Sequence, residues 1–146
     1  MKKFLLPLFV LVGFTFPSSG SAEPARVLFL IGEKEYGTRT SLPTFAKSWL
    51  PSNQFCPTFI FAKSDDRASL DCHRFPGLAA ALKRADILVI STRRRYPSQS
   101  NMTAIRAWVA AGKPIIGLRT ACHGFGERSK GNGYLAPPGH AAWNTF

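Results

Sequence analysis

The chain has 146 residues, of which 45% are hydrophobic and 18% are charged, and it carries a net charge of +11. This length leaves room for one domain, and the chain contains no internal repeats and no low-complexity tract. The excess of basic side chains excludes a chain of acidic overall composition. It favours an acidic partner: nucleic acid inside a cell, or an acidic polysaccharide, anionic ligand or anionic lipid surface outside it.

Residues 1–22 have the composition of a secretory signal. Two lysines follow the first methionine, Phe4–Phe16 is apolar but too short to span a membrane, and Gly20 and Ala22 occupy the positions that a signal peptidase reads. We therefore expect cleavage after Ala22 and export to the periplasm or extracellular space, with an uncleaved membrane anchor as the alternative. Export makes nucleic acid an unexpected partner, and no stable membrane insertion is expected after cleavage.

Residues 23–146 form the expected domain, in which apolar runs alternate with amphipathic segments. Short apolar runs rich in β-branched residues predict buried strands. The expected strands are Val27–Ile31, Thr58–Ala62, Ile87–Ile90 and Ile115–Leu118, and the expected helices are Thr38–Leu50, Leu78–Arg84 and the segment between Ser98 and Gly112. Alternating strands and helices predict an α/β fold, a flavodoxin-like three-layer sandwich around a parallel sheet.

The segment from Ser98 to Gly112 carries the clearest helix signals. Ser98 offers an oxygen to the free amides of a helix start, Gly112 suits the left-handed conformation that ends a helix, and Pro114 prevents continuation. The apolar face of this helix is expected to contain Met102, Ile105, Trp108 and Val109. In the first helix the face toward the sheet is expected to contain Leu42, Phe45, Ala46 and Leu50. Pro43 fits only the first turn of that helix or a later start.

The three cysteines, Cys56, Cys72 and Cys122, leave at least one thiol unpaired in a monomer. A disulfide between Cys56 and Cys72 would close a loop of about 15 residues and contribute about 3 kcal/mol where the geometry allows it. The sequence leaves that pairing open. Because the spacing matches no zinc pattern, we expect no metal site, and we expect no cofactor.

Several motifs of the chain resemble a known family. The positions that carry the likeness are Arg93–Arg95, Lys113, Pro114, Gly117–Thr120, His123 and Phe125. They resemble the ThuA-like (trehalose-utilisation) family of the class I glutamine-amidotransferase-like superfamily, in which serine is usual where Cys122 stands. Gly32–Ala46, and Trp143 with Phe146 as the start of a W-x-x-F segment, extend the resemblance over nearly all of the expected domain.

The resemblance implies a strand order of 2-1-3-4, with the first strand in the middle, and an association with carbohydrate metabolism. Family members continue past the W-x-x-F segment into further strands and a helix. The resemblance therefore implies a sheet that is incomplete at its C-terminal side here, and a truncated product or fragment is expected. Arg119 stands where amidotransferases carry a nucleophilic cysteine. Because a guanidinium cannot attack a carbonyl, glutamine amidotransferase activity is not expected.

Polar residues follow three of the expected strands, and in this topology they converge on one crevice at the carboxyl ends of the strands. The candidate site residues are Glu33, Glu35 and Tyr36, then Arg93, Arg94 and Arg95, then Arg119, Thr120, Cys122 and His123, and finally Trp143. The arginines could hold a carboxylate or phosphate, and Trp143 could stack on a sugar. Alternatively, the glutamates and arginines pair with one another and only set the loop geometry.

The expected ligand is a small carbohydrate-related or anionic polar metabolite, and the oligomeric state is not indicated. Whether the chain is an enzyme stays open, because hydrolase or isomerase chemistry would need His123 together with Glu33 or Glu35. Cys122 is a further candidate nucleophile, since a helix start would lower its pKa. Adjacent side chains in an extended segment point in opposite directions, which argues against a hydrogen-bonded pair of Cys122 and His123. The alternatives are a non-catalytic module for anionic ligands and an inactive remnant.

Overall fold

The computed structural model describes residues 23–126, 137–141 and 143 of the chain. The expected signal segment, residues 1–22, and Phe146 lie outside the described residues. No helix within the described ranges is long and apolar enough to cross a membrane.

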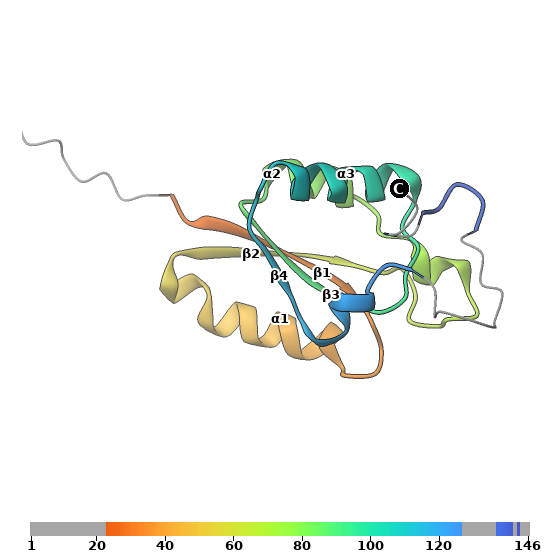
Figure 1. Cartoon of the computed structure of the whole chain (residues 1–146). Coiled ribbons are helices and arrows are strands. Elements are labelled where there is room, and N and C mark those ends of the chain that lie inside the picture. Colours follow the sequence, from red (N-terminus) through yellow and green to blue (C-terminus); the bar gives the residue numbers. More distant parts are fainter. Residues whose placement is uncertain (1–22, 127–136, 142, 144–146) are drawn as a thin grey trace, which may run out of the picture.

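Four parallel strands form the central sheet (Figure 1). They are β1 (Ala25–Gly32), β2 (Phe55–Phe61), β3 (Ile87–Thr92) and β4 (Ile115–Gly117). Their order is β2-β1-β3-β4, and Val27 of β1 lies opposite Pro57 of β2 and Ile87 of β3. The expected order of 2-1-3-4 is confirmed. It places the carboxyl ends of β1, β3 and β4 along one edge of the sheet.

Helices cover both faces of the sheet. α1 (Thr38–Trp49) lies on one face, and α2 (Leu78–Arg84) and α3 (Gln99–Ala110) lie together on the other (Figure 1). The connections contain three short 3-10 helices, η1 (Pro51–Asn53), η2 (Leu70–His73) and η3 (Arg119–His123). The predicted flavodoxin-like three-layer α/β fold is confirmed.

The side chains of β1 fill both layers of the core. Leu28 and Leu30 are fully buried in the cluster formed with α2 and α3, whereas Val27, Phe29 and Ile31 belong to the cluster on the α1 side. Successive residues of a strand point to opposite faces, so a continuous apolar run suits a strand that is covered on both sides. Burying each such side chain contributes about 1.5–3 kcal/mol. β1 therefore anchors the sheet.

The ends of α3 follow the predicted signals. Ser98 Oγ accepts a hydrogen bond from the backbone N–H of Asn101 at 3.3 Å, and Gly112 has a left-handed φ of 64°. The buried face consists of Met102, Ile105 and Trp108. The prediction for Val109 is wrong: it is 40% exposed, because the adjacent residue in the helix already fills the contact with the core.

One prediction for α1 is wrong. Pro43 lies inside the helix rather than in its first turn, because Gly37 turns the chain with a left-handed φ of 62° and the helix begins directly after it. Phe45 lies on the predicted face, where it lines an open apolar groove beside the sheet with Leu42 and Leu50, and it is 51% exposed.

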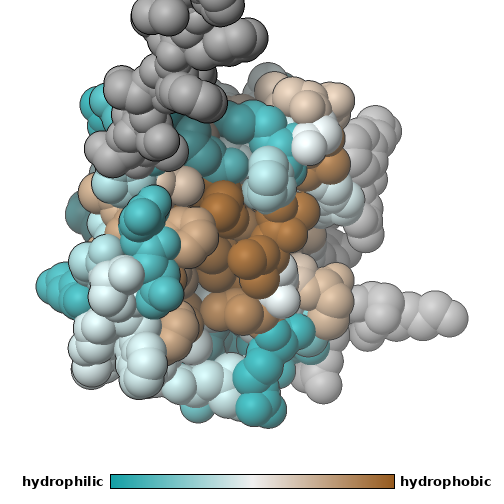
Figure 2. All heavy atoms as spheres, turned by 90° about the vertical axis from the view of Figure 1, so that its left-hand side faces the viewer, coloured by the Kyte–Doolittle hydropathy of each residue, from teal (hydrophilic) through white to brown (hydrophobic). Residues whose placement is uncertain are grey.

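β4 is exposed: its apolar sequence predicted a buried strand, whereas the family resemblance implied a sheet that is incomplete on this side. It ends at Gly117, and Ile115 and Ile116 are 45% and 50% exposed. α1 packs against β1 and β2, and no helix in the described part of the chain covers β4 on that side. An apolar groove of about 310 Å³ therefore lies between α1 and β4, and hydrophobic side chains gather on this face of the molecule (Figure 2).

The three cysteines are free thiols. Cys56 is exposed on β2, Cys72 is buried in η2, and Cys122 is exposed in η3. Cys56 and Cys72 therefore do not form the disulfide that the sequence left open.

Candidate functional site

The segments that follow β1, β3 and β4 meet at one edge of the sheet, which we call the rim. The backbone N–H of Arg93, just after β3, donates to the carbonyl of Gly32 at the end of β1 at 3.2 Å. The backbone N–H of Arg95 donates to the carbonyl of Gly124, after η3, at 2.8 Å. The convergence expected from the topology is therefore present, and backbone hydrogen bonds hold it.

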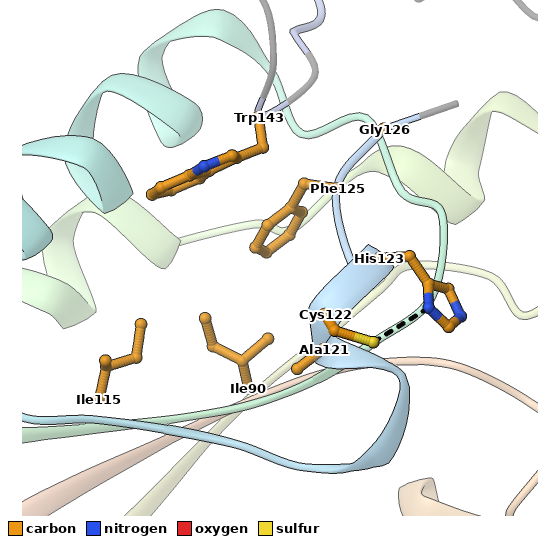
Figure 3. A pocket seen from close by; sticks show the side chains of 8 residues that line it. All are labelled: Ile90, Ile115, Ala121, Cys122, His123, Phe125, Gly126 and Trp143. Carbon is orange, nitrogen blue, oxygen red and sulfur yellow. Dashed lines mark hydrogen bonds between the residues drawn. The ribbon is translucent and has the colours of Figure 1, made fainter. Parts of the chain in front are cut away.

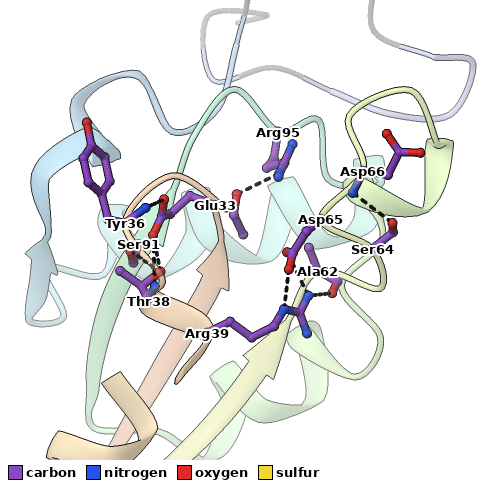
Figure 4. A network of polar contacts seen from close by, with 11 residues as sticks. Glu33, Tyr36, Thr38, Arg39, Ala62, Ser64, Asp65, Asp66, Ser91 and Arg95 are labelled. Atoms are coloured by element: carbon purple, nitrogen blue, oxygen red, sulfur yellow. Dashed lines mark hydrogen bonds and ion pairs between the residues drawn. The ribbon is translucent and has the colours of Figure 1, made fainter. Parts of the chain in front are cut away.

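Glu33 organises the start of α1. It is 1% exposed, and its carboxylate accepts hydrogen bonds from the backbone N–H of Tyr36 at 3.0 Å and that of Thr38 at 3.3 Å (Figure 4). It also accepts from the hydroxyl of Thr38, and that hydroxyl in turn lies 3.2 Å from Ser91 Oγ of β3. A carboxylate at this position stabilises the free amides and the positive end of the helix dipole. The Glu33 carboxylate thus already accepts hydrogen bonds from groups of the fold itself.

Arg95 and Thr120 also face inward. Arg95 is 2% exposed, and its Nε donates to the carbonyl of Gly32 at 2.7 Å (Figure 4). Burial lowers the pKa of this guanidinium, because water is excluded from the charged form. Thr120 is 6% exposed and its hydroxyl donates to the carbonyl of Thr92 at 2.9 Å. Both residues tie the rim to the sheet.

The other charged candidates reach the surface of the rim. Arg93 forms an ion pair with Glu35 across the β1 and β3 loops. The guanidinium of Arg119 lies 3.9 Å from the ring centroid of Tyr36, a cation–π contact between η3 and the β1 loop. The pairing of glutamate with arginine that we expected as an alternative therefore holds for Glu35.

Two of the rim arginines have an unusual backbone. Arg94 has a φ of 50° and Arg119 a φ of 42°, both in the left-handed region that residues other than glycine rarely adopt. The backbone N–H of Arg94 donates to the carbonyl of His123 at 3.0 Å, which ties the β3 loop to η3. The rim thus contains strained backbone that its neighbours hold in place.

Cys122 and His123 form a thiol–imidazole pair, contrary to our expectation. The Sγ of Cys122 lies 3.2 Å from Nδ1 of His123 (Figure 3). The sequence argument assumed an extended segment, in which adjacent side chains diverge. Instead these residues end η3, and in a 3-10 helix successive side chains are about a third of a turn apart. Both residues are exposed.

A cavity of about 280 Å³ opens beside this pair (Figure 3). Its lining consists of Ile90, Ile115, Ala121, Cys122, His123, Phe125, Gly126 and Trp143. The backbone N–H of Trp143 donates to the carbonyl of Phe125 at 3.2 Å, so two aromatic side chains lie along one wall. Sequence reasoning named Trp143 but missed Phe125, although Phe125 belongs to the motif that carries the family resemblance.

A second group of polar residues lies buried behind the rim and was not predicted. His73 of η2 is 8% exposed, and its Nδ1 accepts a hydrogen bond from the backbone N–H of Tyr96 at 3.2 Å. Burial, and then the positive charge of Arg95, lower the pKa of His73 to about 4. Burial raises the pKa of the Cys72 thiol. The sequence did not indicate this buried group, because one histidine in a polar loop is not a distinctive pattern.

No group of three or more His, Cys, Asp or Glu side chains in the described ranges could hold a metal ion. Comparison of the chain with family models, with curated proteins and with solved structures finds no match.

Proposed function

We propose that this chain is an exported, ThuA-like domain that binds a small carbohydrate-related metabolite with an anionic group at the rim. The observation that carries the proposal is the convergence of three loops, which gathers arginines beside a cavity with aromatic walls. The composition of residues 1–22 supports export, and the arginine run with the GKP and GLRT elements supports the family. Glutamine amidotransfer is not part of the proposal, because Arg119 stands at the position of the nucleophile.

The charge of the rim supports an anionic ligand. A small recess between the β1 and β3 loops is lined by the cations Lys34, Arg67, Arg93 and Arg95 and by the carboxylates Glu33 and Glu35. Cations are in excess there, and Glu33 is already occupied by the donors at the start of α1. A concave surface with excess positive charge raises the local concentration of anions, and arginine binds carboxylate and phosphate through paired hydrogen bonds.

The strained backbone at Arg94 and Arg119 also supports a binding role. A left-handed conformation at such residues costs about 1–3 kcal/mol, and it persists where the surrounding structure requires it. Both residues lie at the rim, and among the described residues other than glycine only Gln54 shares this conformation. A loop backbone held this way loses less conformational entropy when a ligand binds.

Binding fits the geometry better than hydrolase or isomerase chemistry. Glu33 is buried and accepts three hydrogen bonds, and Glu35 is paired with Arg93. Neither carboxylate is described within hydrogen-bonding distance of His123, so the acid–base pair that the sequence allowed is not assembled. The proposal therefore assigns recognition to the rim without an acid–base step.

The test is isothermal titration calorimetry of the full chain with glucuronate and with glucose, which differ in one carboxylate. We expect glucuronate to bind about tenfold or more tightly than glucose, because a charge-assisted hydrogen bond contributes about 1.5–3 kcal/mol. We expect added salt to weaken glucuronate binding. Equal affinities for the two sugars would contradict the anionic part of the proposal.

Arg119→Ala should weaken glucuronate binding by about tenfold or more. Arg84→Ala is the matched control, because it removes the same charge at the end of α2, on the other edge of the sheet. Equal affinities of the two variants would place the binding site elsewhere.

A further inference from the structure

The chain contains two Cys-His pairs, and both end a 3-10 helix. Cys72 and His73 end η2, and Cys122 and His123 end η3. In each pair the cysteine sulfur approaches Nδ1 of the following histidine, at 3.5 Å in η2 and 3.2 Å in η3. The two pairs therefore share their local geometry and differ in their surroundings.

The Cys72–His73 pair in η2 is buried and not accessible to reagents in solution. Cys72 is fully buried, and His73 already accepts a hydrogen bond from the backbone N–H of Tyr96 on the same Nδ1. Burial also raises the pKa of the Cys72 thiol, which disfavours the reactive thiolate. By contrast, Cys122 and His123 are both exposed and line the cavity beside η3.

We propose that Cys122 is a nucleophilic thiol for which His123 is the base, and that it reacts with small disulfides that carry an aromatic or aliphatic group. A thiol within hydrogen-bonding distance of an imidazole is the arrangement that activates cysteine for attack. This proposal goes beyond metabolite binding at the rim and does not depend on it.

The lining of the cavity indicates the class of substrate. Phe125 and Trp143 lie along one wall, and Ile90 and Ile115 lie opposite them across the opening toward the sheet (Figure 3). About 280 Å³ accommodates one ring-sized substituent beside the thiol. An apolar substituent packed there would place its sulfur next to Cys122.

The step balances without a further reagent. Nδ1 of His123 takes the proton from the Cys122 thiol, and the thiolate attacks one sulfur of the disulfide. A bond forms between Cys122 Sγ and that sulfur while the disulfide bond breaks, and the departing thiolate takes the proton from the imidazolium. The products are a mixed disulfide on Cys122 and one free thiol. The disulfide substrate is reduced and Cys122 is oxidised.

The test uses dipyridyl disulfide, a neutral aromatic disulfide, on the full chain, with the release of pyridinethione followed by absorbance and the modified cysteines assigned by peptide mass mapping. Cys56 is the internal standard, because it is an exposed thiol on β2 away from the cavity. We expect Cys122 to react roughly tenfold or more faster than Cys56 near neutral pH. A neutral reagent excludes attraction by the arginines as the reason for the difference.

His123→Asn should reduce the rate at Cys122 to that at Cys56, and Cys122→Ser should abolish the fast phase. His140→Asn is the matched control, because it removes another partly exposed histidine and should leave both rates unchanged. Cys72 is fully buried, so its failure to react shows that a variant is folded. Equal rates at Cys122 and Cys56 in the original chain, or a fast Cys122 in His123→Asn, would overturn the proposal. Neither result would bear on glucuronate binding.

Discussion

Replacement of Glu33 separates a structural role from a ligand-binding role at the rim. Glu33→Ala removes a buried carboxylate that accepts from two backbone amides and one hydroxyl, and it leaves the donors of Tyr36 and Thr38 without an acceptor. Hydrogen bonds to a charged group contribute about 1.5–3 kcal/mol, and contributions that share one carboxylate are not additive. We expect a loss of about 3 kcal/mol in the free energy of unfolding.

The assay is urea denaturation of the full chain, with Glu35→Ala as the matched control. Glu35 is 47% exposed and forms one ion pair, so its removal should change stability by less than about 1 kcal/mol. A loss of less than about 1 kcal/mol for Glu33→Ala would refute the reasoning, because the buried carboxylate would then not stabilise the start of α1. Glu33→Gln, which keeps the size and one acceptor, should fall between the two.

Because burial lowers the pKa of His73 from 6.5 to about 4 in the folded chain, the unfolded chain takes up this proton first as the pH falls. The stability due to neutral His73 should be complete above pH 6.5 and be lost between pH 6.5 and about 4, and His73→Gln should remove that part of the pH dependence measured by urea denaturation. Ile105→Ala should lower the free energy of unfolding by about 3 kcal/mol. Ile116→Ala, at a half-exposed position, should lower it by less than about 1 kcal/mol. Gly124→Ala would place a Cβ 2.5 Å from Thr92 Oγ1, and thermal melting should show a loss of about 1–3 kcal/mol.

The strands and helices were predictable where the pattern was long and apolar. β1, β3 and α3 combine continuous or periodic hydrophobic residues with clear ends such as Ser98 and Gly112, and these signals are local. The exposure of Ile116 was not predictable from its own local pattern. Its sequence is that of a buried strand, and whether a second layer covers that strand depends on segments far away in the chain.

The composition of the rim was predictable, but the role of each side chain was not. Parallel topology brings Glu33, Arg95 and Arg119 to one edge, and this requires only the strand order. Which of them turns inward depends on backbone direction in the loops. Glu33 and Arg95 face the interior, whereas the left-handed φ of Arg119 turns its side chain onto Tyr36. The Cys122 and His123 pair was missed because an extended segment was assumed where a 3-10 helix forms.

Arg95 lies between the buried, hydrogen-bonded part of the rim and its exposed part. Its guanidinium holds Gly32 and its own backbone holds Gly124, so one interior residue clamps the ends of two different chain segments. Tyr36 and Arg119 meet outside that clamp, in solvent. A library that randomises Tyr36 and Arg119 would alter ligand selectivity and leave the backbone of the rim unchanged. Randomising Arg95 would instead remove the hydrogen bond that its side chain makes to Gly32 and disturb the segments at Gly32 and Gly124 together.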